Sequence, residues 1–160
     1  MGVYITVRIG PVVKLGQFNI ESNEIKTING CPNCNKKTKD SFCKDCGSAI
    51  KTFDTCVKKY TDTAHDLLWD ISSTNSKLVD DFYVTEDFEN YIIPNFITPN
   101  TYTIDGYGGL SEFISVPSVS EQNEAIHDVE TNDGYKTIKE FCDKHDIECE
   151  VVYAIISYWI

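Results

Sequence analysis

The sequence predicts an α+β fold: a mixed or antiparallel sheet with two to three helices and one short metal-binding insertion. Three observations predict it. Apolar and polar residues alternate over 3–9, as in a strand, whereas apolar residues recur at helical spacing after residues 54 and 133. Two cysteine pairs stand between these segments. With 160 residues, 41% of them hydrophobic, the chain can bury roughly two-thirds of its unfolded surface.

The N-terminal segment predicts extended structure. Val3–Ile9 and Val12–Leu15 are expected to form two strands on either side of Gly10 and Pro11, because these two residue types interrupt strands. Phe18–Ile28 is a further extended stretch that leads into the cysteine region. The first six residues also fit the N-myristoylation pattern, but their alternation favours a strand.

Four cysteines in two tight pairs can close a tetrahedral metal site. Cys31 and Cys34 form the first pair, Cys43 and Cys46 form the second, and eight residues separate the pairs. Each pair brings two thiolates to one ion from a single turn, and the residues between them suffice for a hairpin. Zn²⁺ is the expected ion. Four sulfur ligands leave no position for water or substrate, so the predicted role of the ion is structural.

Residues 31–34 and 42–50 resemble the short zinc ribbons of bacterial and viral proteins, in which C-P-x-C-G precedes a polar hairpin and F-C-x-x-C-G. The resemblance implies zinc binding by the four cysteines and no particular activity, since ribbons occur in polymerase factors, enzymes and adaptors. Gly47 suits the left-handed turn after the second pair. Asn35 stands where the first knuckle usually has glycine. Rubredoxin-like iron sites use similar knuckles with a longer spacer.

The segment after the cysteines predicts a helix over about 55–72, capped by Asp54 or Thr55. Short strands are expected over 82–84, 91–93, 102–104 and 113–116, separated by proline and glycine. The helical positions are Val57, Tyr60, Ala64, Leu67, Leu68 and Ile71.

The C-terminal segment predicts a helix and then a central strand. The helix has one apolar face and is expected to be capped by Asp133, and Val151–Trp159 is apolar on both faces. The first and last strands are expected to pair. The chain then divides into a sheet domain, 1–27 with 54–160, and a zinc-ribbon excursion over 28–53. The apolar face of the helix comprises Tyr135, Ile138, Phe141, Cys142 and His145.

Charge is unevenly distributed along the chain. The formal net charge is −11. Residues 26–59 carry eight lysines against three carboxylates, or +5 without the metal and its thiolates, whereas residues 60–133 carry one lysine against fifteen carboxylates, or −14. This contrast indicates that the two regions face different partners or each other. A solvated acidic surface that keeps the protein soluble is the alternative.

Two other groups of residues have a spacing that suits a metal site or a catalytic site. Asp62, Asp66 and Asp70 would form one row on the expected helix, about 6 Å apart along its axis, with His65 beside them. They suit either a divalent ion or an ordinary solvated helix face. Cys142, His145 and Cys149 suggest a second metal or a thiol catalyst, although a core cysteine and histidine followed by a strand cysteine explain them better. No catalytic constellation is visible, so the protein is not expected to be an enzyme.

The composition favours a cytoplasmic regulator or inhibitor that acts through protein–protein contacts of its acidic surface. Seven cysteines, four of them arranged for a metal, favour a reducing compartment, and no apolar run is long enough to cross a membrane. One arginine against thirteen lysines is typical of an AT-rich genome, as in a phage. A viral factor directed against a host nucleic-acid enzyme or defence system fits these features. The candidate partner-binding residues are Asp62, Asp66, Asp70, Asp80, Asp81, Glu86, Asp87 and Glu89.

The alternative is a nucleic-acid-binding module built on the lysine-rich ribbon. The net charge opposes it unless the acidic region points away. Phe42 is expected to pack on the ribbon, which leaves few aromatic side chains for bases. A metal-dependent enzyme is the third alternative and would need residues from distant segments. The candidate phosphate-binding residues are Lys36, Lys37, Lys39, Lys44, Lys51, Lys58 and Lys59.

Overall fold

The computed structural model describes residues 4–85, 90–98, 100–105 and 115–159, and these confirm the α+β class. The chain forms two compact units. Residues 1–18 and 62–160 form one, called here the sheet unit, and residues 19–61 form the other, called the ribbon unit. The ribbon unit is therefore longer than the 28–53 excursion that we expected, because the strands that carry the knuckles pair with each other and not with the main sheet.

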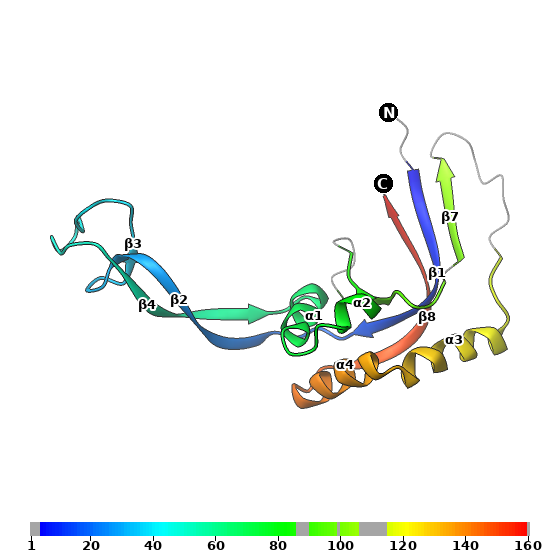
Figure 1. Cartoon of the computed structure of the whole chain (residues 1–160). Coiled ribbons are helices and arrows are strands. Elements are labelled where there is room, and N and C mark those ends of the chain that lie inside the picture. Colours follow the sequence, from blue (N-terminus) through cyan, green and yellow to red (C-terminus); the bar gives the residue numbers. More distant parts are fainter. Residues whose placement is uncertain (1–3, 86–89, 99, 106–114, 160) are drawn as a thin grey trace. The chain divides into compact units, whose positions relative to one another are not determined.

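The sheet unit is built around β1 (Tyr4–Leu15), the middle strand of a five-stranded antiparallel sheet. β8 pairs along the whole of one edge, from Ile5↔Trp159 to Leu15↔Cys149, so the predicted pairing of the first and last strands is confirmed. β7, which lies beside β1 in Figure 1, and β6 follow one another along the other edge. β5 pairs with β6. The bounds are Phe82–Tyr83 for β5, Tyr91–Pro94 for β6, Asn100–Asp105 for β7 and Cys149–Trp159 for β8.

Strand β1 runs without a break through Gly10 and Pro11, so the prediction of two separate strands was wrong. Pro11 lies opposite Tyr153 of β8, at a point where the other edge has no registered partner, since the β7 pairing ends at Ile9 and the β6 pairing begins at Val13. A proline, which lacks an N–H, is tolerated where one side of the ladder is open.

Both faces of β1 are buried, although its sequence alternates. The side chains of Thr6 and Arg8 are only 3% and 4% exposed, as buried as those of Val7 and Ile9. The Arg8 guanidinium donates to the carbonyl of Pro94 at 3.5 Å. The alternation therefore predicted a strand correctly, but the polar face that it indicates is buried and not exposed to solvent.

Strand β8 lies at an edge, which corrects its prediction as a central strand. Among the described strands it pairs with β1 alone, and Ile155 is 60% exposed. The apolar run reflects cover from helices instead: α3 (Val119–Thr131) contacts both β1 and β8, and α4 (Asp133–Lys144) contacts β8 (Figure 1).

The core of the sheet unit extends from the sheet to the shorter helices. α1 (Ala64–Ser72) contacts α4 and β6, and α2 (Leu78–Asp81) is a single turn that leads into β5. No helix in the described part of the chain has the length and apolar character needed to span a bilayer. The side chains with 0–1% exposure that fill this core include Ile9, Leu67, Leu78, Phe82, Ile92, Val129 and Ile138.

The helix expected over 55–72 begins only at Ala64. Residues 51–61 form β4 instead, and Thr63 is the N-cap, with its side chain accepting from the Asp66 amide at 3.1 Å. Exposure in β4 alternates with period two, since Phe53, Thr55 and Val57 are partly covered while the residues between them are exposed. The strand pattern and its pairing with β2 prevail over the partial helical spacing.

The C-terminal helix is confirmed, with its cap one residue earlier than expected. The Asn132 side chain, not that of Asp133, accepts from the Gly134 and Tyr135 amides at 2.7 and 3.3 Å. The expected strand over 113–116 lies partly outside the described residues, and Ser115 and Val116 form no strand.

We expect Ser118→Ala to lower the free energy of unfolding by roughly 0.5–2 kcal/mol. Ser118 begins α3 with a capping box, in which its hydroxyl accepts from the Glu121 amide and the Glu121 carboxylate accepts from the Ser118 amide at 2.8 Å. The Ser118 hydroxyl and amide also lower the pKa of Glu121, so this contribution is present at neutral pH and is lost as the pH falls through that pKa. Urea unfolding at neutral and acidic pH tests this: the effect of the substitution should shrink in acid, and a constant difference would contradict it.

Candidate metal centre

The ribbon unit is a long two-stranded antiparallel ribbon with the cysteines at one end. β2 (Ile20–Cys31) pairs with β4 (Lys51–Thr61) from Ile20↔Thr61 to Gly30↔Lys51, and the short β3 (Lys36–Lys37) pairs with the end of β2 (Figure 1). An isolated two-stranded ribbon is marginally stable in water. A bound metal would stabilise this end of it.

The first knuckle joins β2 to β3. Cys31 and Lys36 are opposite each other in the pairing, and the Cys34 amide donates to Cys31 Sγ at 3.4 Å. Asn35 has φ of 54°, the left-handed conformation that we expected at this position. Asparagine adopts it more readily than most residues, so it serves in place of glycine.

The second knuckle is a hairpin closed by backbone hydrogen bonds. The Gly47 amide donates to the Cys43 carbonyl and the Cys43 amide donates to the Ser48 carbonyl, both at 2.8 Å. Gly47 has φ of 71°, as predicted. A β-bridge between Phe42 and Ala49 continues the hairpin.

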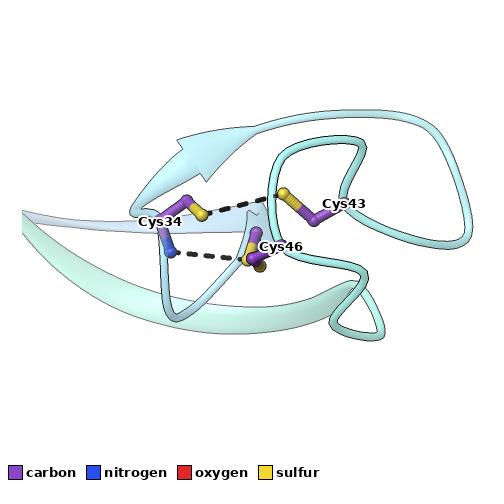
Figure 2. A group of neighbouring side chains, drawn as sticks. Cys34, Cys43 and Cys46 are labelled. Atoms are coloured by element: carbon purple, nitrogen blue, oxygen red, sulfur yellow. Dashed lines mark hydrogen bonds between the residues drawn. The ribbon is translucent and has the colours of Figure 1, made fainter.

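The four cysteine sulfurs converge on one point and fit a tetrahedral metal. All four lie within 4.8 Å of one another. Cys31 and Cys46 sulfurs are 3.4 Å apart, and those of Cys34 and Cys43, which face each other in Figure 2, are 3.8 Å apart. A tetrahedral site with Zn–S bonds of about 2.3 Å requires sulfur–sulfur distances of roughly 3.8 Å. The chain therefore carries a four-cysteine site that suits a metal ion, with zinc as the ion that these ligands favour.

The electrostatics of the four thiols also call for a cation. The Ser48 hydroxyl, 3.3 Å from the sulfur, lowers the pKa of Cys46 to about 6. The neighbouring sulfurs of Cys46 and Cys43 raise the pKa of Cys34 to about 12. Without an ion, crowded sulfurs cannot all ionise at neutral pH, whereas a divalent cation stabilises all four thiolates together.

Several residues that support the site were missed from the sequence. Asn33 Nδ2 donates to Ser48 Oγ at 2.8 Å, and Lys36 Nζ donates to Asp45 at 2.5 Å, so two polar contacts tie the first knuckle to the second. Ser48 stands two residues after a ligand, which is the only signal for its role that the sequence offers. Such contacts outside the ligand set orient metal ligands.

Gly30 is required by close packing of the first knuckle. A Cβ at this position would lie 2.2 Å from the Lys36 carbonyl oxygen, which is backbone and cannot move without opening the β2–β3 pairing. We expect Gly30→Ala to lower zinc affinity by about tenfold or more, the size of effect seen when residues that orient metal ligands are lost. Competition with a chromophoric chelator measures this, with Gly47→Asn as a milder comparison because asparagine tolerates the same turn. An unchanged affinity would show that the knuckle does not depend on this contact.

The lysines of the ribbon unit are spread along it, since Lys58 and Lys59 lie opposite Asn23 and Ser22, near the end of the ribbon away from the cysteines. Four of them bind carboxylates of the same unit: Lys26, Lys36, Lys44 and Lys58 pair with Glu24, Asp45, Asp40 and Glu21. Lys37, Lys39 and Lys51 make no ion pair within the described residues. Phe42 is 63% exposed, so the expectation that it packs on the ribbon was wrong: the hairpin is too thin to cover it.

The expected acidic row is not formed. Asp62 precedes α1, so only Asp66 and Asp70 lie on that helix, and Asp66 also accepts from Thr63 at the N-cap, at 3.0 Å. Asp80 and Asp81 lie on α2, with Asp80 exposed. Glu86, Asp87 and Glu89 lie outside the described residues.

Cys142, His145 and Cys149 do not form a second metal group with further ligands in the described part of the chain. Cys142 is fully buried, and a hydrogen bond to Cys149 is the main cause that raises its pKa. The His145 ring packs on Phe141, with centroids 4.5 Å apart. These residues fit the core interpretation.

Comparisons with protein-family models, with curated proteins and with solved structures found no match for this chain.

Proposed function

We propose that this chain is a non-enzymatic zinc protein whose acidic sheet unit binds a basic surface of a protein partner, as a regulator or inhibitor. The observation that carries the proposal is the separation of charge between the two units. The sheet unit has twenty carboxylates against six basic residues, a net charge of −14, whereas the ribbon unit has eight lysines against five carboxylates, or +3 without the metal and its thiolates.

The carboxylates of α3 are available to a partner. All four on α3 are exposed, and Glu124 and Asp128 are one helical turn apart on the same side of that helix. Lys14, Lys136 and Lys139 pair with Glu150, Asp133 and Asp143, which neutralises a small part of the charge. Complementary charge steers association and selects partners, so a dense acidic surface favours a basic one.

The partner class that we propose is a host nucleic-acid enzyme or defence protein. A surface that binds phosphates is basic, and carboxylates can compete for it. A viral origin is consistent with the single arginine among fourteen basic residues. The reducing cytoplasm is the compartment we propose, because four thiols must stay reduced to bind metal. In this proposal the metal site orders the ribbon unit and takes no part in a reaction, since four sulfurs complete its coordination.

A charge-variant capture experiment tests the proposal. Zinc-loaded protein with Glu124→Gln and Asp128→Asn, and a second variant with Asp80→Asn and Asp81→Asn, are compared with the unchanged chain for capture of proteins from a host lysate. The partner is then purified and its affinity measured at about 50 and about 200 mM salt. We expect at least one acidic variant to lose affinity and the complex to weaken with salt, because screening reduces interactions between exposed charges.

The matched control neutralises two unpaired lysines of the ribbon unit, Lys37→Gln and Lys39→Gln, and should leave capture of the same protein unchanged. Capture that is lost in this control and kept in both acidic variants would contradict the proposal and place the partner on the ribbon unit.

Nucleic-acid binding by the ribbon unit is the second candidate, and the exposed Phe42 favours it. An exposed aromatic ring beside unpaired cations is the combination that binds single strands, by stacking on bases and contacting phosphates. If Lys37, Lys39 and Lys51 contact three phosphates, affinity for a single strand should fall about 20-fold between about 50 and 200 mM salt. Phe42→Ala should weaken it by a further ~1–3 kcal/mol. No complex with single-stranded DNA or RNA at the lower salt concentration would remove this candidate.

A further inference from the structure

No described strand pairs with the outer edge of β4, and because Thr61 at its end is buried, the edge that another strand could join runs from Lys51 to Tyr60. Among the described strands, β4 pairs with β2 alone, whereas the outer edge of β2 is covered by β3 at Gly30 and Cys31. An edge of about ten residues is long, and such edges readily accept another strand. Edge lysines commonly oppose such pairing through repulsion between like charges.

The sequence of β4 is complementary to itself when two copies run antiparallel about Cys56. In that register a residue a given number of positions before Cys56 lies opposite the residue the same number after it. Asp54 then lies opposite Lys58 of the second copy, and this pair occurs twice by symmetry. The remaining opposed pairs are Thr55 with Val57, Phe53 with Lys59 and Thr52 with Tyr60.

No lysine opposes a lysine in this register, so the usual protection of an edge is absent. Opposite charges directly across an antiparallel pair stabilise it, and aromatic and β-branched residues, which occupy six of the eleven positions of β4, suit both faces of such a sheet. Cys56 is exposed at the centre, and Ile25, opposite it in β2, is 75% exposed.

We propose that two copies of this chain associate through their β4 edges, in antiparallel register centred on Cys56, to form one sheet from two ribbon units. The second copy is the occupant that the charges favour, because a twofold axis brings Asp54 and Lys58 opposite each other, which adds a contact to those that they make within one chain with Thr27 and Glu21. Association also stabilises the two-stranded ribbon, since sheets of more strands are more stable than an isolated pair. This inference is independent of the partner proposed for the sheet unit.

Charge reversal at the opposed pair tests the register. Lys58→Asp places two aspartates opposite each other across the twofold axis, and Asp54→Lys places two lysines together, so each variant alone should have a dimer dissociation constant at least about tenfold higher. Mixed in equal amounts, the two variants restore opposite charges across the interface. Light scattering of the zinc-loaded full chain should therefore show a dimer for the unchanged protein, monomers for each variant, and a heterodimer for the mixture.

Loss of the Lys58–Glu21 ion pair within one chain cannot produce this rescue on mixing, so the heterodimer is specific for the proposed contact. Zinc content of one ion per chain shows that each variant keeps its metal site. A short bismaleimide should also join two copies of the unchanged chain through Cys56 and fail with Cys56→Ser, which keeps all four metal ligands. A monomeric unchanged chain that is not cross-linked at Cys56, or zinc-loaded variants that stay monomeric when mixed, would overturn the proposal.

Discussion

Cys43→Ser is expected to abolish zinc binding and to unfold the metal-bearing end of the ribbon unit while the sheet unit stays folded. Cys43 is 7% exposed, and its sulfur is one of four that converge within 4.8 Å. Structural zinc contributes on the order of 10 kcal/mol of apparent binding free energy to small metal-stabilised domains, and much of it is lost with one ligand. Few apolar contacts in the knuckles can compensate, since Phe42 and Ala49 are exposed.

Two probes separate the units in this experiment. Both tryptophans, Trp69 and Trp159, belong to the sheet unit, so tryptophan fluorescence during urea unfolding reports on that unit alone. Amide hydrogen exchange over β4 reports on the ribbon unit. We expect rapid exchange in β4 with an unchanged fluorescence midpoint. Cys56→Ser is the matched control because Cys56 is exposed and is not a ligand; equal exchange protection in Cys43→Ser and this control would contradict the metal's role.

Phe82→Ala is expected to lower the free energy of unfolding of the sheet unit by about 3–5 kcal/mol. Phe82 is 1% exposed and makes an edge-to-face contact with Phe96 at 5.5 Å between ring centroids. Its ring also lies against the start of α4, because a Cβ on Gly134 would be 2.8 Å from Phe82 Cε2. Truncation therefore leaves a cavity between β5 and α4 that neither element can easily close.

Tyr83→Ala supplies the comparison for that substitution. Tyr83 is the next residue of the same strand, but it is 39% exposed. Its truncation should cost far less, and zinc content should stay at one ion per chain in both variants. Equal losses of stability from the two substitutions would show that Phe82 does not anchor this core.

The metal site could be predicted from the sequence because its determinants are local. The spacing within each cysteine pair fixes two ligands on one turn, and the residues after each pair, Asn35 and Gly47, have the left-handed backbone that was expected. The pairing of β1 with β8 was also predictable, since the alternation over 3–9 and the apolar run over 151–159 each indicate a strand. Ser48 and Gly30 were missed because their roles depend on contacts between the two knuckles.

The segments that were predicted wrongly depend on competition between local pattern and distant pairing. Val57 and Tyr60 share a helical spacing with Ala64, but they pair with Glu24 and Glu21 of β2, a preference that one segment alone does not reveal. α3 was not predicted because Val129 is its only fully buried residue, although Ser118 and Glu121 already formed a recognisable capping box. Gly10 and Pro11 were predicted to break the strand because the sequence does not show that one edge of β1 is unpaired at these residues, between the β7 and β6 pairings.

Metal analysis of the chain purified without added metal tests the central claim most directly. Elemental analysis should find one zinc per chain, and replacement by Co²⁺ should give the sulfur-to-cobalt charge-transfer bands and visible absorption of a tetrahedral four-sulfur site. Cys31→Ser with Cys34→Ser should remove both signals, whereas Cys142→Ser should leave them unchanged. A metal content near zero, or cobalt spectra without sulfur ligation, would contradict the assignment of Cys31, Cys34, Cys43 and Cys46 as the ligands of a structural zinc.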